Sequence, residues 1–266
     1  MTTSVLSPVA ARDIALAVAA QAADLLREGW GKAERVTAKR LATDLVTEWD
    51  TRAEELIVGE LRRRAPGVAI LGEESGAHGA EGEDRWLVDP IDGTVNFAHG
   101  FPIFSVAIAY EVRGAPVAGV VAAPVLGWTF AAALGAGATR DGAPIHTSAE
   151  DDLSRALLVT GFPYDRRESP RNNFDAFVHM QRTAGAVRRL GAASLDLCFV
   201  ACGWLDGYWE MKLKPWDVSA GALIVAEAGG RVTDLAGGAF SSASGECIAS
   251  NGRIHDAMVR ELAGRL

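Results

Sequence analysis

Hydrophobic and polar residues follow a helical period near the start of the chain and a strand pattern further on. Two helices are predicted, at residues 8–29 and 49–64, the first opened by a Ser-Pro pair and the second closed by Pro-Gly. Short apolar runs of strand length follow at residues 68–71 and 86–88. The segment 104–139 consists of apolar runs separated by turn residues, which predicts a meander of antiparallel strands.

Beyond residue 144 the pattern alternates between strand and helix. Strands are predicted at residues 157–160, 186–190, 205–211 and near Arg231 and Cys247, and helices at 171–184, 194–201, 218–228 and from near Arg253. The sequence therefore predicts a mixed α/β fold with two parts. These are an N-terminal α+β subdomain, residues 1–146, and a C-terminal α/β subdomain, residues 147–266.

The composition of the 266-residue chain is that of a globular protein, with 49% hydrophobic and 23% charged residues. A net charge of −8 argues against binding to nucleic acid or to an anionic membrane surface. No apolar run has the length of a membrane span, and the N-terminus lacks the pattern of a secretion signal. The three cysteines lack zinc-site spacing, so we expect buried free thiols and a cytoplasmic protein.

The segment 86–97 carries the strongest sign of chemistry. Its apolar run stops at Asp89 and Asp92, which flank a proline, and Gly93-Thr94 follow. Carboxylates at the end of a strand suit hard cations, and backbone amides directly after them suit an anion. The segment therefore favours a site that holds a divalent metal against a phosphate. Taken alone, it is also compatible with an Asx turn that binds nothing.

Further acidic residues lie at the ends of other predicted elements: Asp44, Asp50, Glu73, Glu74, Glu210 and Asp217. A site for two or three Mg²⁺ ions needs several carboxylates, one of which bridges two ions. We expect Asp89 to be the bridge, because it lies at a rigid strand end. Asp92 and Asp217 then complete the ligands of one ion, and Glu73 those of another.

Two further groups complete the predicted site. The change of backbone direction after Pro90 lets the Ile91 carbonyl serve as a neutral metal ligand. A threonine hydroxyl hydrogen-bonded to an acid can orient a metal-bound water and take up its proton. Thr94 beside Asp50 is the candidate pair.

The chain resembles the inositol monophosphatase family, within the lithium-sensitive, Mg²⁺-dependent phosphatase superfamily. The matching segments are Gly-Glu-Glu-Ser at 72–75, Asp-Pro-Ile-Asp-Gly-Thr at 89–94, Pro-Trp-Asp at 215–217 and Glu-Ala-Gly-Gly at 227–230. They occur in family order and span essentially the whole chain. The resemblance implies a layered αβαβα sandwich that assembles as a homodimer.

The resemblance also implies metal ligands. Glu73, Asp89 and the Ile91 carbonyl match the ligands of the first Mg²⁺ ion. Asp89, Asp92 and Asp217 match those of the second, and Glu73 also serves a weaker third ion.

The catalytic and substrate-binding groups follow in the same way. Thr94, backed by Asp50, matches the group that activates the attacking water, and the backbone amides of Gly93 and Thr94 match the phosphate cradle. The groups that match contacts to the polyol are Asp92, the Ala193 region and Glu210. Lys39, which matches a residue that approaches the site late, and Glu74 are further candidates.

The predicted function is Mg²⁺-dependent hydrolysis of a small polyol phosphate monoester, with myo-inositol 1-phosphate as the first substrate. Glu210 favours that substrate, whereas Ala192 replaces a hydroxyl residue common in the family. Fructose 1,6-bisphosphate and histidinol phosphate are alternative substrates. A second phosphate would need a basic group at the pocket mouth, for which Arg166-Arg167 and Arg188-Arg189 are candidates, although we expect surface pairs. A binding module acting on transcription complexes is the non-enzymatic alternative.

Overall fold

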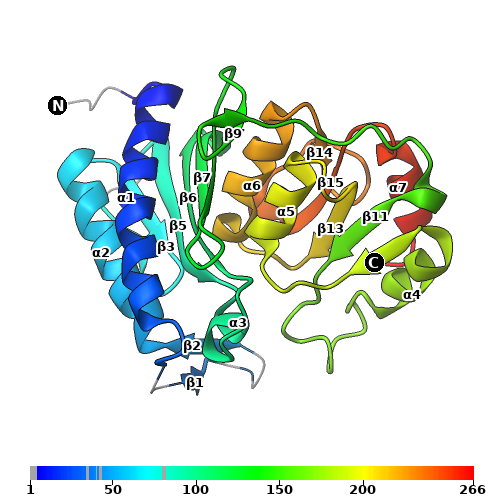
Figure 1. Ribbon diagram of the computed structural model, residues 1–266, viewed down its shortest axis with the longest axis horizontal. Coiled ribbons are helices and arrows are strands. Elements are labelled where there is room, and N and C mark those ends of the chain that lie inside the picture. Colours follow the sequence, from blue (N-terminus) through cyan, green and yellow to red (C-terminus); the bar gives the residue numbers. More distant parts are fainter. Residues whose placement is uncertain (1–4, 34–35, 40, 42–43, 80–81) are drawn as a thin grey trace.

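Layers of helix and sheet alternate across the molecule in the computed structural model (Figure 1). The structure describes residues 5–33, 36–39, 41, 44–79 and 82–266. Helices α1 (Pro8–Gly29) and α2 (Glu48–Arg64) form one outer layer against a large sheet. Helices α5 (Ala193–Ala201) and α6 (Pro215–Glu227) lie between that sheet and a smaller one. The other outer layer contains α4 (Phe174–Thr183) and α7 (His255–Leu262), so the predicted αβαβα sandwich is confirmed.

The large sheet has eight strands in the order β10-β9-β8-β7-β6-β5-β3-β4. Neighbours pair antiparallel except β3 and β5, which are parallel. Its strands are β3 (Ala69–Gly72), β4 (Gly76–His78), β5 (Asp84–Asp92), β6 (Ser105–Val112), β7 (Ala115–Ala123), β8 (Trp128–Ala133), β9 (Ala138–Arg140) and β10 (Ala143–Pro144). The run from β6 to β9 is the meander that the sequence predicts.

The smaller sheet has five strands in the order β12-β11-β13-β15-β14. Strand β11 is parallel to both β12 and β13, and the other pairs are antiparallel. Its strands are β11 (Leu157–Thr160), β12 (Ala186–Arg188), β13 (Gly207–Met211), β14 (Arg231–Thr233) and β15 (Glu246–Ser250). Short elements complete the described structure: β1 (Val36–Ala38), β2 (Leu45–Thr47), α3 (Thr94–Ala98), η1 (Leu153–Arg155) and η2 (Ser242–Ser244).

Small residues allow the central helices to lie close to the sheet. Gly119 on β7 faces α6, and a Cβ atom there would lie 2.8 Å from the Ala220 Cα atom. Such a distance is far below van der Waals contact, so a side chain at this position would push α6 away from β7. The helix α6 carries Asp217 in its first turn. The close approach therefore fixes the position of a predicted site residue.

Three predicted boundaries are wrong in ways that affect the site. Strand β5 does not stop at Asp89 but runs to Asp92. Helix α6 begins at Pro215, which places Asp217 at its third residue rather than at its N-cap. Helix α4 begins only after Asn173, which has a left-handed φ of 74°. The division into two subdomains stays a prediction.

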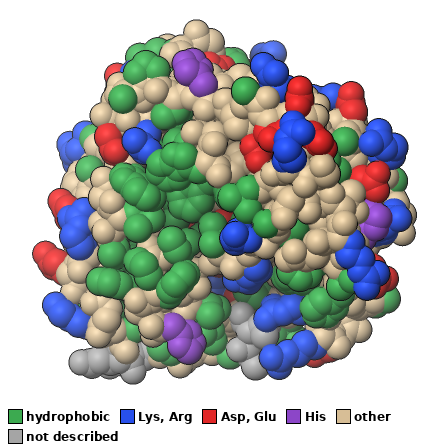
Figure 2. All heavy atoms as spheres, turned by 45° about the vertical axis from the view of Figure 1, so that its right-hand side comes forward, with side chains coloured by type: hydrophobic (Ala, Val, Ile, Leu, Met, Phe, Trp, Pro, Cys, Tyr) green, Lys and Arg blue, Asp and Glu red, His purple; other side chains and the backbone are tan. Residues whose placement is uncertain are grey.

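The surface and the cysteines bear on other expectations. Cys198 and Cys247 are buried free thiols, whereas Cys202 is only half-buried. No helix within the described ranges is both long and apolar enough to cross a membrane. Hydrophobic side chains gather on one face of the molecule (Figure 2), and the exposed large hydrophobic side chains include Phe101, Phe174 and Val178.

Candidate active site

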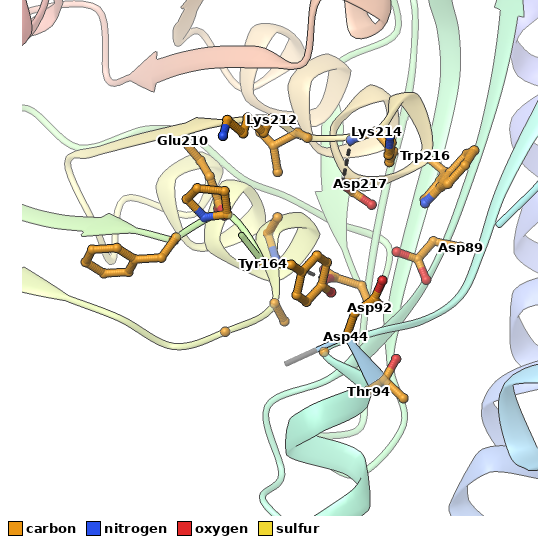
Figure 3. Close-up of a pocket in the computed structure, with 18 of the residues that line it drawn as sticks. Asp44, Asp89, Asp92, Thr94, Tyr164, Glu210, Lys212, Lys214, Trp216 and Asp217 are labelled. Atoms are coloured by element: carbon orange, nitrogen blue, oxygen red, sulfur yellow. Dashed lines mark hydrogen bonds between the residues drawn. The ribbon is translucent and has the colours of Figure 1, made fainter. Parts of the chain in front are cut away.

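A cavity of about 490 Å³ opens between the end of β5, the first turns of α5 and α6, and the end of β13. Acidic side chains from separate elements point into it. Figure 3 shows Asp89, Asp92 and Asp217 directed toward one space, with Glu210 at the opposite end. We call the end with Asp89, Asp92 and Asp217 the acidic or metal end, and the end with Glu210, where the sequence predicts contacts to the polyol, the polyol end.

An irregularity in β5 lets two of its aspartates face the same cavity. Residues three apart in a regular strand point to opposite faces of the sheet. The pairing of β5 with β6 shifts between Asp89 and Asp92, so this alternation is broken. Gly93 follows with a left-handed φ of 90°, and a Cβ atom there would lie 3.1 Å from the Gly191 carbonyl oxygen. Both conformation and space therefore require glycine at this turn.

Asp89 lies at the centre of the acidic end. Its side chain is 2% exposed, and its Oδ1 atom makes no hydrogen bond with any described residue. Burial raises the pKa of the Asp89 carboxyl well above its usual value, and the charges of Glu73, Asp92 and Asp217 raise it further. A cation between these carboxylates would remove the repulsion, so the residues fit a divalent metal.

In this structure each neighbouring carboxylate also accepts hydrogen bonds from the protein. Glu73 accepts from Lys39 Nζ at 2.7 Å, and Asp217 accepts from the Lys214 amide at 2.7 Å. Accordingly, no three His, Cys, Asp or Glu side chains of the described ranges converge as ligands of one ion. Burial lowers the pKa of Lys39, but the charges of Glu73 and Glu74 outweigh that effect and raise it. Lys39 is thus a cation paired with Glu73, one of the predicted metal ligands, and with Glu74.

A buried glutamate fixes the loop that carries Glu73 and Glu74. The Glu54 carboxylate is 2% exposed and accepts hydrogen bonds from the amides of Glu74 at 2.8 Å and Ser75 at 2.6 Å. These charge-assisted bonds hold the turn after β3. Glu54 was not predicted from the sequence, where it is one of several acids in an amphipathic helix.

The structure brings Thr94 and Asp50 together, as the sequence predicts. The Thr94 hydroxyl lies within donating distance of Asp50 Oδ1 at 3.0 Å and of the Ile91 carbonyl at 2.9 Å. Asp50 is in the first turn of α2, where its Oδ2 atom accepts from the Thr47 amide at 2.7 Å. Burial raises the pKa of Asp50 to about 6. The Thr94 oxygen can therefore accept a hydrogen bond from a water while its own O–H donates to the protein.

Asp92 joins the two ends of the cavity. Its carboxylate accepts from the Ala193 amide at 3.1 Å, and from the amide and hydroxyl of Ser194 at 2.7 and 2.6 Å. These are donors at the start of α5, where a negative charge is favoured. The Ala193 amide thus helps to hold Asp92, and the contact of the Ala193 region with the polyol stays a prediction. Burial nevertheless raises the pKa of Asp92 above its usual value.

Glu210 lies at the other end of the cavity. Its Oε2 atom accepts from the Tyr208 hydroxyl at 2.9 Å, and burial raises the pKa of its carboxyl to about 7. Gly161 makes room for it, because a Cβ atom at residue 161 would lie 2.1 Å from Glu210 Oε1. This steric reason for a glycine at residue 161 was not visible in the sequence.

Several residues that line the cavity were not among the predicted site residues. Arg189 belongs to a pair that we expected at the surface; it is exposed, yet it also lines the cavity. Tyr164, whose ring is 54% exposed, points among the acidic side chains (Figure 3). Asp196 is a carboxylate in an otherwise apolar helix, which is the sequence signal that could have identified it. Asp44, noted before only as an acid near a strand, also lines the cavity.

A carboxylate-lined cavity at the end of β5 in this layered sandwich suits an enzyme that binds divalent cations together with a phosphate ester. Residues 7–265 match the Inositol monophosphatase family. The chain belongs to this family, which confirms the predicted class of enzyme, a phosphoric monoester hydrolase.

Relatives of known name agree with this assignment. An "Inositol-1-monophosphatase" of Synechocystis is 43% identical over 88% of this chain and 82% of its own length. A "Nus factor SuhB" of Pseudomonas aeruginosa is 40% identical over 96% of both chains. The solved structure of an inositol monophosphatase from Anabaena is 41% identical over 96% of both chains, with a TM-score of 0.87.

Proposed function

We propose that this protein hydrolyses the phosphate monoester of a small polyol, with myo-inositol 1-phosphate as its preferred substrate. The observation that carries the proposal is the buried Asp89, surrounded by three further carboxylates and lacking a hydrogen bond at Oδ1. The Thr94–Asp50 pair lies at this end, and Glu210 lies at the other. Relatives that carry the name inositol-1-monophosphatase support the choice of substrate.

Two to three Mg²⁺ ions would be held by Glu73, Asp89, the Ile91 carbonyl, Asp92 and Asp217. Bound there, Mg²⁺ supplies a water of lowered pKa and positive charge for the leaving oxygen. Thr94 accepts a hydrogen bond from the attacking water, and Asp50 fixes the direction of the Thr94 hydroxyl. The backbone amides of Gly93 and Thr94 hold the phosphate in line with that water.

Charge at the polyol end favours a substrate with one phosphate. Arg189 lines this end, but Asp92, Asp196 and Glu210 lie close enough for its charge to act on each of their carboxyl groups. The Asp92 carboxylate close to this guanidinium offsets its charge, so Arg189 offers no net positive charge to a second phosphate. Arg166 does not line the cavity. These facts favour inositol 1-phosphate over fructose 1,6-bisphosphate.

A kinetic panel tests the proposal. The purified protein is assayed with Mg²⁺ on inositol 1-phosphate, fructose 1,6-bisphosphate and histidinol phosphate, and kcat/KM is compared. We expect the first substrate to be preferred, and the preference to fall in Glu210→Gln, which loses the charged form of a substrate contact. A higher kcat/KM on either of the other two substrates would refute the assignment of the substrate. Absence of activity on all three would refute the proposed phosphatase activity.

We further propose a cytoplasmic homodimer that lithium inhibits. The hydrophobic face in Figure 2 supports self-association, since a large exposed apolar area is typical of an interface. Light scattering of the purified protein should give the mass of two chains, and LiCl should lower the rate at saturating Mg²⁺. The carboxylates at every predicted ligand position favour an enzyme over a module that only binds other proteins.

A further inference from the structure

Asp196 lies in the wall of the cavity, and neither metal binding nor activation of water requires it. It is on α5, where the remaining side chains from Leu195 to Ala201 are apolar. Its side chain is 1% exposed, and its Oδ1 atom makes no hydrogen bond with any described residue. A buried carboxyl without a partner is unfavourable for folding, so its place in an apolar helix calls for a ligand-related explanation.

The position of Asp196 on α5 directs it toward the polyol end. Residues three apart in a helix share a face, so Asp196 lies one turn beyond Ala193 on the same side. The Ala193 amide in turn donates to Asp92. Asp92 and Glu210 are both close enough for their charges to act on the Asp196 carboxyl, and Arg189 opposes them. Asp196 therefore belongs to the cluster of groups around Glu210.

We propose that Asp196 is a specificity-determining residue that hydrogen-bonds a hydroxyl group of the polyol, alongside Asp92 and Glu210. The proposal deepens the function proposed above and rests on it. The ligand class is a neutral ring or chain that carries several hydroxyl groups, one of which meets the Asp196 carboxyl group.

The protonation state of Asp196 suits that role. Burial raises the pKa of its carboxyl well above the usual value, and the charges of Glu210 and Asp92 raise it further. A protonated carboxyl both donates and accepts a hydrogen bond, as a hydroxyl group does. Ionised acids nearby only accept. A polyol, whose hydroxyl groups need both kinds of partner, is therefore matched better by this mixture than by ionised acids alone.

The test compares a polyol substrate with one that lacks hydroxyl groups. For each variant, kcat/KM is measured with Mg²⁺ on inositol 1-phosphate and on phenyl phosphate, and the ratio of the two is formed. Asp196→Leu removes the hydrogen bond, and we expect the ratio to fall about tenfold, the equivalent of about 1.4 kcal/mol. Asp196→Asn retains a donor and an acceptor, so its ratio should stay within about threefold of that of the wild type.

Asp206→Asn serves as the matched control. Asp206 is a partly buried acid outside the cavity lining, and it accepts from the Leu157 amide at 2.7 Å. Its variant should lose thermal stability and leave the ratio unchanged. If Asp196→Leu does not fold, Asp196→Ala supplies the same comparison.

Stability gives a second measurement. In metal-free protein, Asp196→Leu should raise Tm by about 2 °C or more, because it removes an unpartnered buried acid. The proposal would be overturned if this variant kept the wild-type ratio of kcat/KM on the two substrates. That outcome includes equal losses of kcat/KM on both substrates with a lower Tm, which would show a structural role for Asp196. A wild-type protein inactive on both substrates would instead defeat the proposed phosphatase function itself.

Discussion

Replacement of Asp89 by asparagine should stabilise the metal-free protein and destroy its activity. Asp89 is buried among acids, and both this burial and the charge of the neighbouring Glu73 raise the pKa of the Asp89 carboxyl. An amide of the same shape carries no charge, and its NH₂ group can donate to Glu73. The same change removes the carboxylate proposed to bridge two metal ions.

The change should raise stability and lower activity, and the magnitude of each effect can be estimated. A hydrogen bond to a charged group contributes about 1.5–3 kcal/mol. In a protein of this size 1 kcal/mol moves Tm by about 2–4 °C, so Asp89→Asn should raise Tm in EDTA by about 3–12 °C. Loss of a main electrostatic stabiliser of the transition state should lower kcat by about 10³-fold, or about 4 kcal/mol.

The assay is thermal unfolding with and without Mg²⁺, combined with the rate on inositol 1-phosphate. Mg²⁺ at one hundred times its Kd stabilises the wild type by about 2.7 kcal/mol, which is a rise in Tm of about 5–10 °C. The rise should be smaller in Asp89→Asn. If the variant keeps both its rate and the full response to Mg²⁺, the bridging assignment of Asp89 is wrong.

Glu111→Gln is the control for removing a buried charge. The Glu111 side chain is fully buried like that of Asp89, but its carboxylate is satisfied by three donors: Ser219 at 2.9 Å, Ser242 at 2.6 Å and Arg85 at 2.8 Å. Its replacement should lower Tm, since it weakens these charge-assisted bonds. The response to Mg²⁺ should not change, because Glu111 does not line the cavity.

Three further changes test other parts of the site. Thr94→Ala should lower kcat by about 10²–10⁴-fold while Thr94→Ser retains most of it, as the hydroxyl is the functional group; equal loss in both would contradict that role. Gly161→Ala should displace Glu210, because its Cβ would lie 2.1 Å from Glu210 Oε1. The preference for inositol 1-phosphate over phenyl phosphate should therefore fall. Gly59→Ala is the control, because its Cβ meets nothing within 4 Å, and it should leave that preference unchanged. Burial raises the pKa of Glu210 from 4.5 to about 7. Between these two values the folded protein keeps a proton that the unfolded chain releases. In EDTA the free energy of unfolding should therefore fall as pH rises from about 4 to 8. Urea titrations should show this fall flattened in Glu210→Gln, and equal slopes in both proteins would refute the assignment.

The motif at the end of β5 shows what the sequence can reveal. Asp89, Asp92 and Thr94 were predicted as site residues from their types and spacing, and the structure places all three at one cavity. The means by which they meet was not predicted. A regular strand would turn Asp89 and Asp92 to opposite faces, and the shift in pairing with β6 depends on a segment more than ten residues further along the chain.

The partners of the acidic side chains were also beyond the sequence. Asp217 was interpreted as an acid at a helix cap or a metal ligand, and the structure gives it the Lys214 amide as a donor. The Ala193 region was predicted to contact the polyol, and the sequence did not reveal that the Ala193 amide also donates to Asp92. Which donor an acid meets is decided by tertiary contacts between elements, whereas residue type and spacing only show that an acid needs one.

The same contacts connect the proposed metal end and the proposed polyol end of the cavity. Asp92 extends from the irregular end of β5 to the amides that open α5, so a shift of this carboxylate toward a cation also pulls on the helix that carries Asp196. The acids at the metal end repel one another and raise each other's pKa. A cation relieves that repulsion, and the hydrogen bonds from Ser194 then fix how far Asp92 can move. The geometry of the polyol end is thus linked to the charge of the metal end through a single side chain.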